Sequence, residues 1–317
     1  MLTALAFAIA GVVGLVVTPI VRHYAHRLEL LDKPGGRKVH QVPVPRLGGV
    51  AMTLAFAAGV GVAALVAREM GSAAFLRLSL APAILGGVAL LLVVGLIDDI
   101  RGMPPLAKLA GQVAVALLAA VMGLRLDELT FPWGSVELGP LAIPLTVIWV
   151  VGVMNAVNLI DGLDGLATGV ALTVLGAFGL LAVLDGVDPT QPIIAATVGA
   201  AVGFLAYNLH PASIIMGDTG SMLLGFMVAA IAISLTQDAS RPVAPWVPII
   251  ALGVPLIDTA WAVVRRTARG EPFFVADRGH VHHQLLRRGL SQRDAMLTLT
   301  AVSAAFAILA VGVAQLD

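Results

Sequence analysis

Long apolar runs separated by short polar segments make up most of the sequence. Each run is close to the ~20 residues that an α-helix needs to cross a bilayer. Polar side chains gather at the ends of the runs and seldom fall inside them. This pattern predicts an all-α polytopic membrane protein with a single membrane domain over residues 1–317. Ten spans are expected, at about residues 2–21, 47–67, 79–97, 106–122, 141–158, 166–184, 193–208, 220–236, 245–264 and 297–314.

The basic residues predict how these spans are oriented. Counting Lys108, which lies just inside the start of the fourth span, 15 of the 19 lysines and arginines belong to the odd-numbered connections and four to the even-numbered ones. Because loops rich in Lys and Arg stay in the cytoplasm, the odd-numbered connections are expected there, with both termini outside. The connection 123–140, between the fourth and fifth spans, would then be periplasmic. Its alternating pattern predicts a short β-hairpin that turns at Trp133 and Gly134.

Composition agrees with a membrane protein and excludes several kinds of site. The chain is 59% hydrophobic and 12% charged, whereas soluble proteins are roughly 45–50% apolar and about a quarter charged. The formal net charge is zero, so no nucleic-acid partner is expected. The absence of cysteine excludes disulfides, Fe–S clusters and zinc–thiolate sites. The first apolar run starts at Leu2 without a basic segment before it, which predicts an uncleaved membrane helix.

The strongest chemical signal is a polar segment between the fifth and sixth spans. Asn155, Asn158, Asp161 and Asp164 follow one another at intervals of three residues. Neighbouring pairs would share a helix face if the segment were helical, whereas its glycines permit a tight break. Ionisable groups beside hydrocarbon are costly, so a functional role is the first hypothesis. A polar turn built from Asn, Asp and Gly is the structural alternative.

Two further acidic motifs lie at span ends on the same predicted side. Asp98 and Asp99 end the third span, where adjacent carboxylates repel each other and oppose the helix dipole. A bound cation or Lys108 on the next span would relieve this repulsion, and a simple salt-bridged helix end is the alternative. Asp218 stands at the start of the eighth span, where it is expected to be the N-cap. The free N–H groups at such a helix start favour phosphate.

Two cytoplasmic loops are candidates for binding an anion. The first is rich in proline and glycine, and plain positive-inside topology is the alternative explanation of its basic residues. The last places three histidines beside an arginine, a set that could hold a metal ion or a pyrophosphate. Anion binding is favoured because the acidic ligands elsewhere are of the type that Mg²⁺ prefers. The residues concerned are Lys33, Arg37, Lys38, His40 and Arg46 in the first loop, and Arg278, His280, His282 and His283 in the last.

One acidic residue falls inside a predicted span. Asp258 lies in the ninth span, and Arg265 and Arg266 follow it seven and eight residues later. A buried structural ion pair with one of these arginines is the expected role. The other acidic and basic motifs together suit a metal ion and a diphosphate, a combination that suggests phosphoryl transfer at the membrane surface.

Five separated motifs resemble those of the polyprenyl-phosphate N-acetylhexosamine-1-phosphate transferases, a superfamily in glycosyltransferase family 4. In order, they are residues 32–49, Asp98–Asp99 with Lys108, residues 155–165, residues 217–221 and residues 280–283. The His-x-His-His pattern of the last motif and the first loop resemble the N-acetylglucosamine branch. The resemblance implies transfer of N-acetylglucosamine-1-phosphate from UDP-N-acetylglucosamine to undecaprenyl phosphate, with release of UMP. It also implies a multi-pass protein of the inner membrane whose active site faces the cytoplasm.

The same resemblance implies roles for individual residues. Asp218 would coordinate Mg²⁺ together with Asn158, with Mn²⁺ as an alternative metal. Asp98 or Asp99 would act as the base or would position the lipid phosphate, and Lys108 would hold a phosphate. Asp161 and Asp164 would support the nucleotide and the metal, and Asn155 belongs to the same substrate-binding motif. The donor diphosphate would be held by Arg278, His280, His282 and His283.

Two alternatives remain open at this stage, and the resemblance also admits a homodimer. One is the phospho-MurNAc-pentapeptide translocase of peptidoglycan synthesis, which differs in its donor and typically carries consecutive histidines. The other is a cation-coupled transporter that would use its membrane carboxylates. Transporters place their sites near the bilayer midplane and often contain inverted repeats. The acidic clusters here lie at the ends of spans, and no internal repeat is evident.

Overall fold

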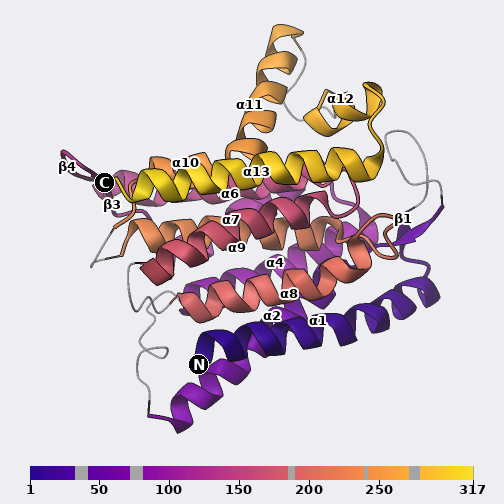
Figure 1. Cartoon of the computed structure of the whole chain (residues 1–317), viewed down its shortest axis with the longest axis horizontal. Coiled ribbons are helices and arrows are strands. Elements are labelled where there is room, and N and C mark those ends of the chain that lie inside the picture. The colour runs from indigo at the N-terminus through magenta and orange to yellow at the C-terminus, as the bar shows by residue number, and fades with distance from the viewer. Residues whose placement is uncertain (33–41, 72–80, 185–189, 239–241, 271–278, 317) are drawn as a thin grey trace.

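A bundle of long, roughly parallel helices forms the body of the protein (Figure 1). The computed structural model describes residues 1–32, 42–71, 81–184, 190–238, 242–270 and 279–316. Within these ranges, eight helices are long and apolar enough to cross a membrane. They are α1 (Leu2–Arg27), α2 (Gly48–Glu69), α4 (Ala81–Arg101), α6 (Ala142–Ile160), α7 (Leu166–Leu184), α8 (Gln191–Asn208), α9 (Gly217–Thr236) and α13 (Gln292–Ala314).

Helix α9 is the centre of the bundle. Nearly all of its residues are buried, and it packs against α2, α4, α6 and α7. Small residues allow close approach: a Cβ on Gly49 of α2 would lie 2.2 Å from the backbone nitrogen of Gly220, and one on Gly95 of α4 would lie 2.6 Å from the Cα of Thr219. This packing fixes the first turn of α9 between the ends of two other helices.

The fourth and ninth predicted spans differ from the other eight. The fourth corresponds to α5 (Pro105–Val121), an apolar helix of 17 residues. The ninth is broken into α10 (Trp246–Ala251) and α11 (Gly253–Ala268), and α11 projects away from the bundle (Figure 1). Pro255 has no N–H to donate to the preceding turn, and a Cβ on Gly253 would lie 2.6 Å from the Phe306 ring of α13. The expectation of one continuous helix over 245–264 was therefore wrong.

A β-hairpin and both chain termini lie at one end of the bundle (Figure 1). Strands β3 (Glu128–Phe131) and β4 (Gly134–Glu137) pair antiparallel after α5, followed by the short 3₁₀ helix η1 (Gly139–Leu141). The turn falls on Pro132–Trp133, one residue earlier than expected. The side chain of Gln237, just after α9, exchanges hydrogen bonds with the hairpin backbone at Asp127 and Glu128.

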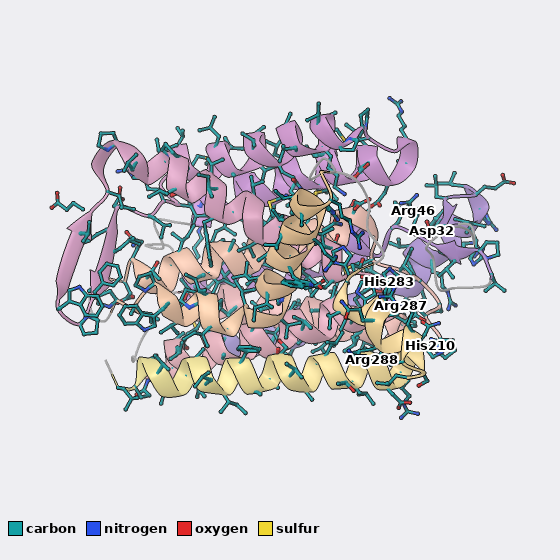
Figure 2. The ribbon with its side chains drawn as sticks, turned by 90° about the horizontal axis from the view of Figure 1, so that it is seen from above. Asp32, Arg46, His210, His283, Arg287 and Arg288 are labelled. Atoms are coloured by element: carbon teal, nitrogen blue, oxygen red, sulfur yellow. The ribbon has the colours of Figure 1, made fainter. Side chains whose placement is uncertain are left out.

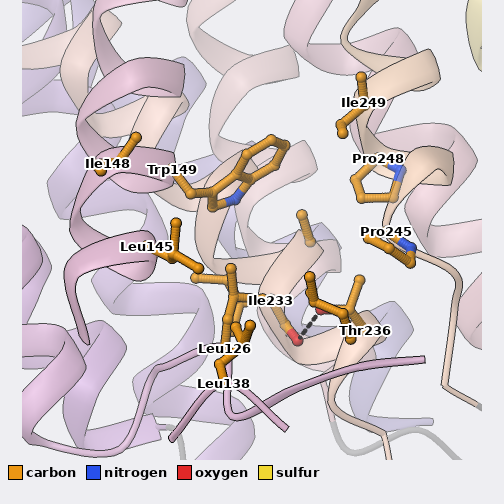
Figure 3. A pocket seen from close by; sticks show the side chains of 12 residues that line it. Leu126, Leu138, Leu145, Ile148, Trp149, Ile233, Thr236, Pro245, Pro248 and Ile249 are labelled. Atoms are coloured by element: carbon orange, nitrogen blue, oxygen red, sulfur yellow. Dashed lines mark hydrogen bonds between the residues drawn. The ribbon is translucent and has the colours of Figure 1, made fainter. Parts of the chain in front are cut away.

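An apolar cavity of about 300 Å³ lies beneath the hairpin, between α6, the end of α9 and α10 (Figure 3). Its two main polar side chains already have hydrogen-bond partners. Trp149 of α6 donates to the Ala229 carbonyl of α9, and Thr236 donates to the Ile233 carbonyl of its own helix. The cavity therefore offers no polar chemistry. The short strands β1 (Leu31–Asp32) and β2 (Val44–Pro45) and the helix α12 (Val281–Arg287) lie at the opposite end of the bundle.

Candidate active site

Polar side chains from distant parts of the chain converge at the end of the bundle away from the hairpin. The last turns of α4 and α6 and the first turns of α5 and α9 meet there. The β2 segment, the α8–α9 loop and α12 surround this meeting point. Figure 2 shows their polar residues at this one end: Asp32, Arg46, His210, His283, Arg287 and Arg288.

Lys108 is the central cation of the site. Its Nζ lies 2.5 Å from Oδ1 of Asp218 and 3.1 Å from Oδ2 of Asp98. The other oxygen of Asp98 accepts a hydrogen bond of 2.7 Å from the backbone N–H of Met103. Charge-assisted hydrogen bonds of this length are strong, and Asp98 is almost fully buried. Lys108 was predicted to offset the repulsion between Asp98 and Asp99, and it does so by pairing with Asp98.

Asp99 performs a different task from its neighbour. Its carboxylate accepts hydrogen bonds from the backbone N–H of Asp218 at 2.8 Å and of Thr219 at 3.1 Å, and from the Thr219 hydroxyl at 2.6 Å. Asp99 thus caps the start of α9 from another helix, using N–H groups that no intrahelical acceptor can satisfy. Asp218 is the second residue of α9 and not its N-cap, so that expectation was wrong.

The polar segment after the fifth span is half helical and half turn. Asn155 and Asn158 belong to α6, whereas Asp161 and Asp164 lie in the turn before α7. Asn158 donates its amide hydrogens to Oδ1 of Asp218 and to the Ser221 hydroxyl, both at 2.7 Å. The side-chain oxygen Oδ1 of Asn158 has no partner among the described residues, and neither has the carboxylate of Asp161.

Asp161 lies half-buried in an acidic environment. Burial of the carboxyl raises its pKa to about 8, and the nearby charges of Asp218, Asp99 and Asp164 add to this effect, while Lys108 opposes it. A carboxyl in this environment is stabilised as a carboxylate by any cation that binds beside it. The site is therefore short of positive charge in the absence of a bound cation.

Asn155 and Asp164 hold the walls of the site. Asn155 donates to Oε1 of Gln112 on α5 at 2.8 Å. Asp164 accepts from Nδ1 of His210 at 2.8 Å and from the backbone N–H of Ala212 at 3.0 Å, which fixes the loop before α9. These contacts join elements to one another, so both residues act on the site through its framework.

The first basic loop reaches the site through its last residues. Arg46 places Nη2 3.9 Å from Oδ1 of Asp99 and Nη1 3.9 Å from Oδ1 of Asp32. The backbone of this segment pairs with Ile215 and Met216, the residues that precede α9. The other candidates from this loop, Lys33, Arg37, Lys38 and His40, lie outside the described residues.

The histidine loop packs against the turn that contains Asp161. His282 is 2% exposed, and a Cβ on Gly162 would lie 2.2 Å from its Nε2. Burial lowers the pKa of His282 to about 3, helped by the neighbouring His283 and His280, so its imidazole is neutral at physiological pH. His283 is half-buried, and Arg278 lies outside the described residues.

His280 and Asp258 correct one expectation. Nδ1 of His280 lies 2.8 Å from Oδ2 of Asp258, and both side chains are buried. The partner of Asp258 is therefore His280, and neither Arg265 nor Arg266. This contact uses Nδ1 of His280, and the expected role of the ring in holding the diphosphate stays a prediction.

The donor atoms beside Lys108 fit a hard divalent cation. Mg²⁺ takes one or two carboxylates and completes its shell with water and substrate phosphates. The carboxylates of Asp218 and Asp161 and the unpartnered carbonyl oxygen of Asn158 supply such oxygens. Among the described residues, no three His, Cys, Asp or Glu side chains could hold a metal by themselves. The site therefore suits Mg²⁺ or Mn²⁺ that binds together with a phosphate, and not a structural Zn²⁺.

Several residues that build the site carry no strong sequence signal of their own. Ser221 and Thr219 follow Asp218 closely, so the same motif could have indicated them. Gln112 and Asn208 lie inside apolar spans, where a lone carboxamide is the signal. Asn208 accepts from the Gly165 backbone N–H at 3.1 Å and donates to the Ile214 carbonyl at 3.1 Å.

The fold and the site define a multi-pass membrane protein whose polar centre is suited to phosphate groups. The model of glycosyl transferase family 4 matches residues 81–236, which include the ends of α4, α5, α6 and α9. Similarity to curated proteins extends over nearly the whole chain. The chain belongs to glycosyl transferase family 4.

Three relatives illustrate this similarity. A probable undecaprenyl-phosphate N-acetylglucosaminyl 1-phosphate transferase of Bacillus subtilis is 35% identical over 308 residues, covering 96% of this chain and 83% of the relative. A decaprenyl-phosphate N-acetylglucosaminephosphotransferase of Mycobacterium tuberculosis is 36% identical over 314 residues, covering 92% and 77%. An undecaprenyl-phosphate alpha-N-acetylglucosaminyl 1-phosphate transferase of Escherichia coli is 30% identical over 297 residues, covering 92% and 78%.

Proposed function

We propose that the protein transfers N-acetylglucosamine-1-phosphate from UDP-N-acetylglucosamine to undecaprenyl phosphate and releases UMP. The observation that carries this proposal is the Lys108 ammonium between Asp98 and Asp218, at the buried ends of four helices. The names of the relatives supply the substrates, since all three act on a polyprenyl phosphate and N-acetylglucosamine. Such a product would begin the membrane stage of a cell-envelope glycan.

In this reaction an oxygen of the lipid phosphate attacks the β-phosphorus of the UDP-sugar. The bond between that phosphorus and the bridging oxygen breaks, and UMP leaves with the electron pair. Asp218, Asn158 and Asp161 would hold Mg²⁺, which when bound neutralises charge on the diphosphate and the leaving UMP. Lys108 would bind the phosphate at the same place and stabilise the charge that develops there.

The two adjacent carboxylates of α4 receive different roles. Asp99 is committed to the start of α9 by three hydrogen bonds, so it acts by holding Asp218 in place. Asp98 faces Lys108 directly, and its Oδ2 accepts no well-aligned hydrogen bond. We therefore assign Asp98 as the carboxylate that positions the lipid phosphate or accepts its proton.

The site end of the bundle would face the cytoplasm, and the hairpin and the termini the opposite side. The basic residues support this orientation, because 14 of the 19 lie in connections predicted on the site's side and Lys108 lies directly beside one of them. With α5 and the α10–α11 pair added to the eight long helices, the chain would cross the inner membrane ten times. A polar site at one end of the bundle also argues against a transporter, whose site would lie near the midplane.

UMP release from purified protein tests this proposal. The assay contains undecaprenyl phosphate, Mg²⁺ and either UDP-N-acetylglucosamine or UDP-MurNAc-pentapeptide. Release with the first donor alone is expected, and Asp218→Ala should abolish it while Asp127→Ala, on the exposed hairpin side, should not. Release with the pentapeptide donor alone would assign the chain to the translocase reaction instead. Light scattering on the same preparation would measure the homodimer that the resemblance admits.

A further inference from the structure

The carboxylate of Asp258 is the charged group that joins the projecting helix α11 to the histidine loop. It is 6% exposed, and both of its oxygens are used. Oδ2 lies 2.8 Å from Nδ1 of His280, and Oδ1 accepts a hydrogen bond of 2.9 Å from the backbone N–H of Val281. Because a carboxylate only accepts, His280 carries its proton on Nδ1. Asp258 therefore sets the tautomer and the orientation of His280 together.

The same carboxylate determines where α12 begins. His280 is the N-cap of this helix, and its own side chain makes no capping hydrogen bond. Asp258 supplies the missing acceptor from α11 by binding the first backbone N–H of α12. A helix of seven residues is not stable by itself, so its position depends on such tertiary contacts.

A continuous series of contacts leads from His280 to the acidic turn. The ring of His280 stacks parallel to that of His282, with centroids 5.8 Å apart and planes 5° apart. The ring of His283 packs against that of His282, with centroids 4.2 Å apart. His282 in turn rests against Gly162, which has no room for even a Cβ on that side. Gly162 follows Asp161, whose carboxylate has no partner among the described residues.

His282 is the member of this series that contacts the turn containing Asp161, and its ring is buried. Its Nδ1 is buried and has no hydrogen-bond partner among the described residues. Because this nitrogen makes no hydrogen bond, the orientation of the ring depends on packing against its neighbours. The stack on His280, fixed by Asp258, provides that support.

We propose that Asp258 is a positioning residue for the reaction, which holds the histidine cluster of His280, His282 and His283 against the Asp161 turn. This inference rests on the proposed function and adds to it a residue outside the five motifs. Asp258 acts through His280 and touches neither substrate. Because the cluster lies against the turn that would support the UDP-sugar, loss of Asp258 should weaken use of the donor and leave use of the lipid unchanged.

The test compares Asp258→Asn, His280→Ala and the double variant by their steady-state constants. Asparagine keeps the size of the side chain, but its single oxygen cannot accept from Val281 and from His280 at the same time, and its NH₂ group then faces the other partner. We expect KM for UDP-N-acetylglucosamine to rise about 10-fold in each single variant, the range seen when a group that orients an active-site residue is removed. KM for undecaprenyl phosphate should stay within about twofold of the native value. The donor KM of the double variant should be no higher than that of the more impaired single variant, because the effects of residues in contact are not additive.

Two controls separate this proposal from the proposed function and from misfolding. Asp127→Asn removes a carboxylate at the hairpin end, where Asp127 pairs with exposed Arg125, and should leave both KM values unchanged. The ¹⁵N shifts of labelled histidine report the Nδ1–H tautomer of His280 without turnover, and this tautomer should be present in the native protein and lost in Asp258→Asn. A native enzyme that releases no UMP would refute the proposed function, whereas the histidine spectra would still decide the role of Asp258. Native donor KM in Asp258→Asn, or multiplying effects in the double variant, would overturn the positioning role.

Discussion

Gly217→Ala is the substitution that tests most sharply how Asp218 is held. Gly217 has φ +70°, and a Cβ there would lie 2.5 Å from Oδ1 and 2.8 Å from Oδ2 of Asp99. The alanine side chain would therefore occupy the place of the carboxylate that caps α9. We expect the cap to be displaced and Asp218 to move with the first turn of its helix.

The cost has two parts that can be worked from the structure. A residue with a Cβ in the left-handed region costs about 1–2 kcal/mol. Displacing Asp99 adds the loss of a hydrogen bond to a charged acceptor, about 1.5–3 kcal/mol, most directly the 2.8 Å bond from the Asp218 backbone N–H. The sum predicts a loss of about 2.5–5 kcal/mol in the free energy of unfolding. Turnover should fall by more than about tenfold, since roughly 1.4 kcal/mol of lost transition-state stabilisation suffices for that.

Gly71→Ala is the matched control for this measurement. Gly71 has φ +64° at the end of α2, and a Cβ there would meet nothing within 4 Å. It should show only the conformational part, about 1–2 kcal/mol, and native turnover. Thermal unfolding in detergent and UMP release measure both quantities. If the two variants lost the same stability and both kept native turnover, the Asp99 cap would have no part in holding Asp218.

Three further predictions concern charge and the metal. Lys108→Met leaves the carboxylates of Asp98 and Asp218 without their cation, so we expect a loss of about 3 kcal/mol in thermal unfolding and no UMP release; native activity would exclude Lys108 from the reaction. Because the pKa of His282 is lowered from 6.5 to about 3 on folding, the stability it contributes is present above pH 6.5 and is lost as the pH falls, by about 2 kcal/mol at pH 5. Unfolding curves of His282→Gln should lack this part of the pH dependence, and an unchanged dependence would contradict it. Chelation with EDTA should stop UMP release, and Mg²⁺ but not Zn²⁺ should restore it; full activity in EDTA would remove the metal from the mechanism.

Hydrophobic patterning predicted the long helices because each is set by its own local sequence. The break between α10 and α11 was missed, since residues 245–264 read as one apolar run. At the break, Pro255 has no N–H to donate to the preceding turn, and Gly253 packs closely against Phe306, more than fifty residues away. Apolar composition records that a segment avoids water, but it does not record where a helix within that segment breaks.

The sequence predicted which residues meet in the candidate site better than it predicted the contacts that each of them makes. Asp98, Lys108, Asn158 and Asp218 meet as the motifs suggested. The separate duty of Asp99 could not be predicted, because its partners on α9 are over a hundred residues distant and adjacent carboxylates look equivalent in sequence.

The pairing of Asp258 shows the same limit at shorter range. In sequence its nearest basic residues on a helical path are Arg265 and Arg266, and an ion pair within α11 was the natural expectation. The chain instead returns after α11 and brings His280 back against it. Local spacing can identify a buried charge, whereas the partner of that charge is fixed only by the path of the loop.

The central claim, transfer of the sugar together with its phosphate, is tested most directly with UDP-N-acetylglucosamine carrying ³²P in the β-phosphate. The purified protein is incubated with this donor, undecaprenyl phosphate and Mg²⁺, and the lipid is then extracted. The account predicts that the label moves into the lipid fraction while unlabelled UMP appears in the water phase. Label that stays in the water phase as UDP, with an unlabelled sugar on the lipid, would show attack at the sugar carbon and contradict the phosphoryl-transfer site described for Asp98, Lys108 and Asp218.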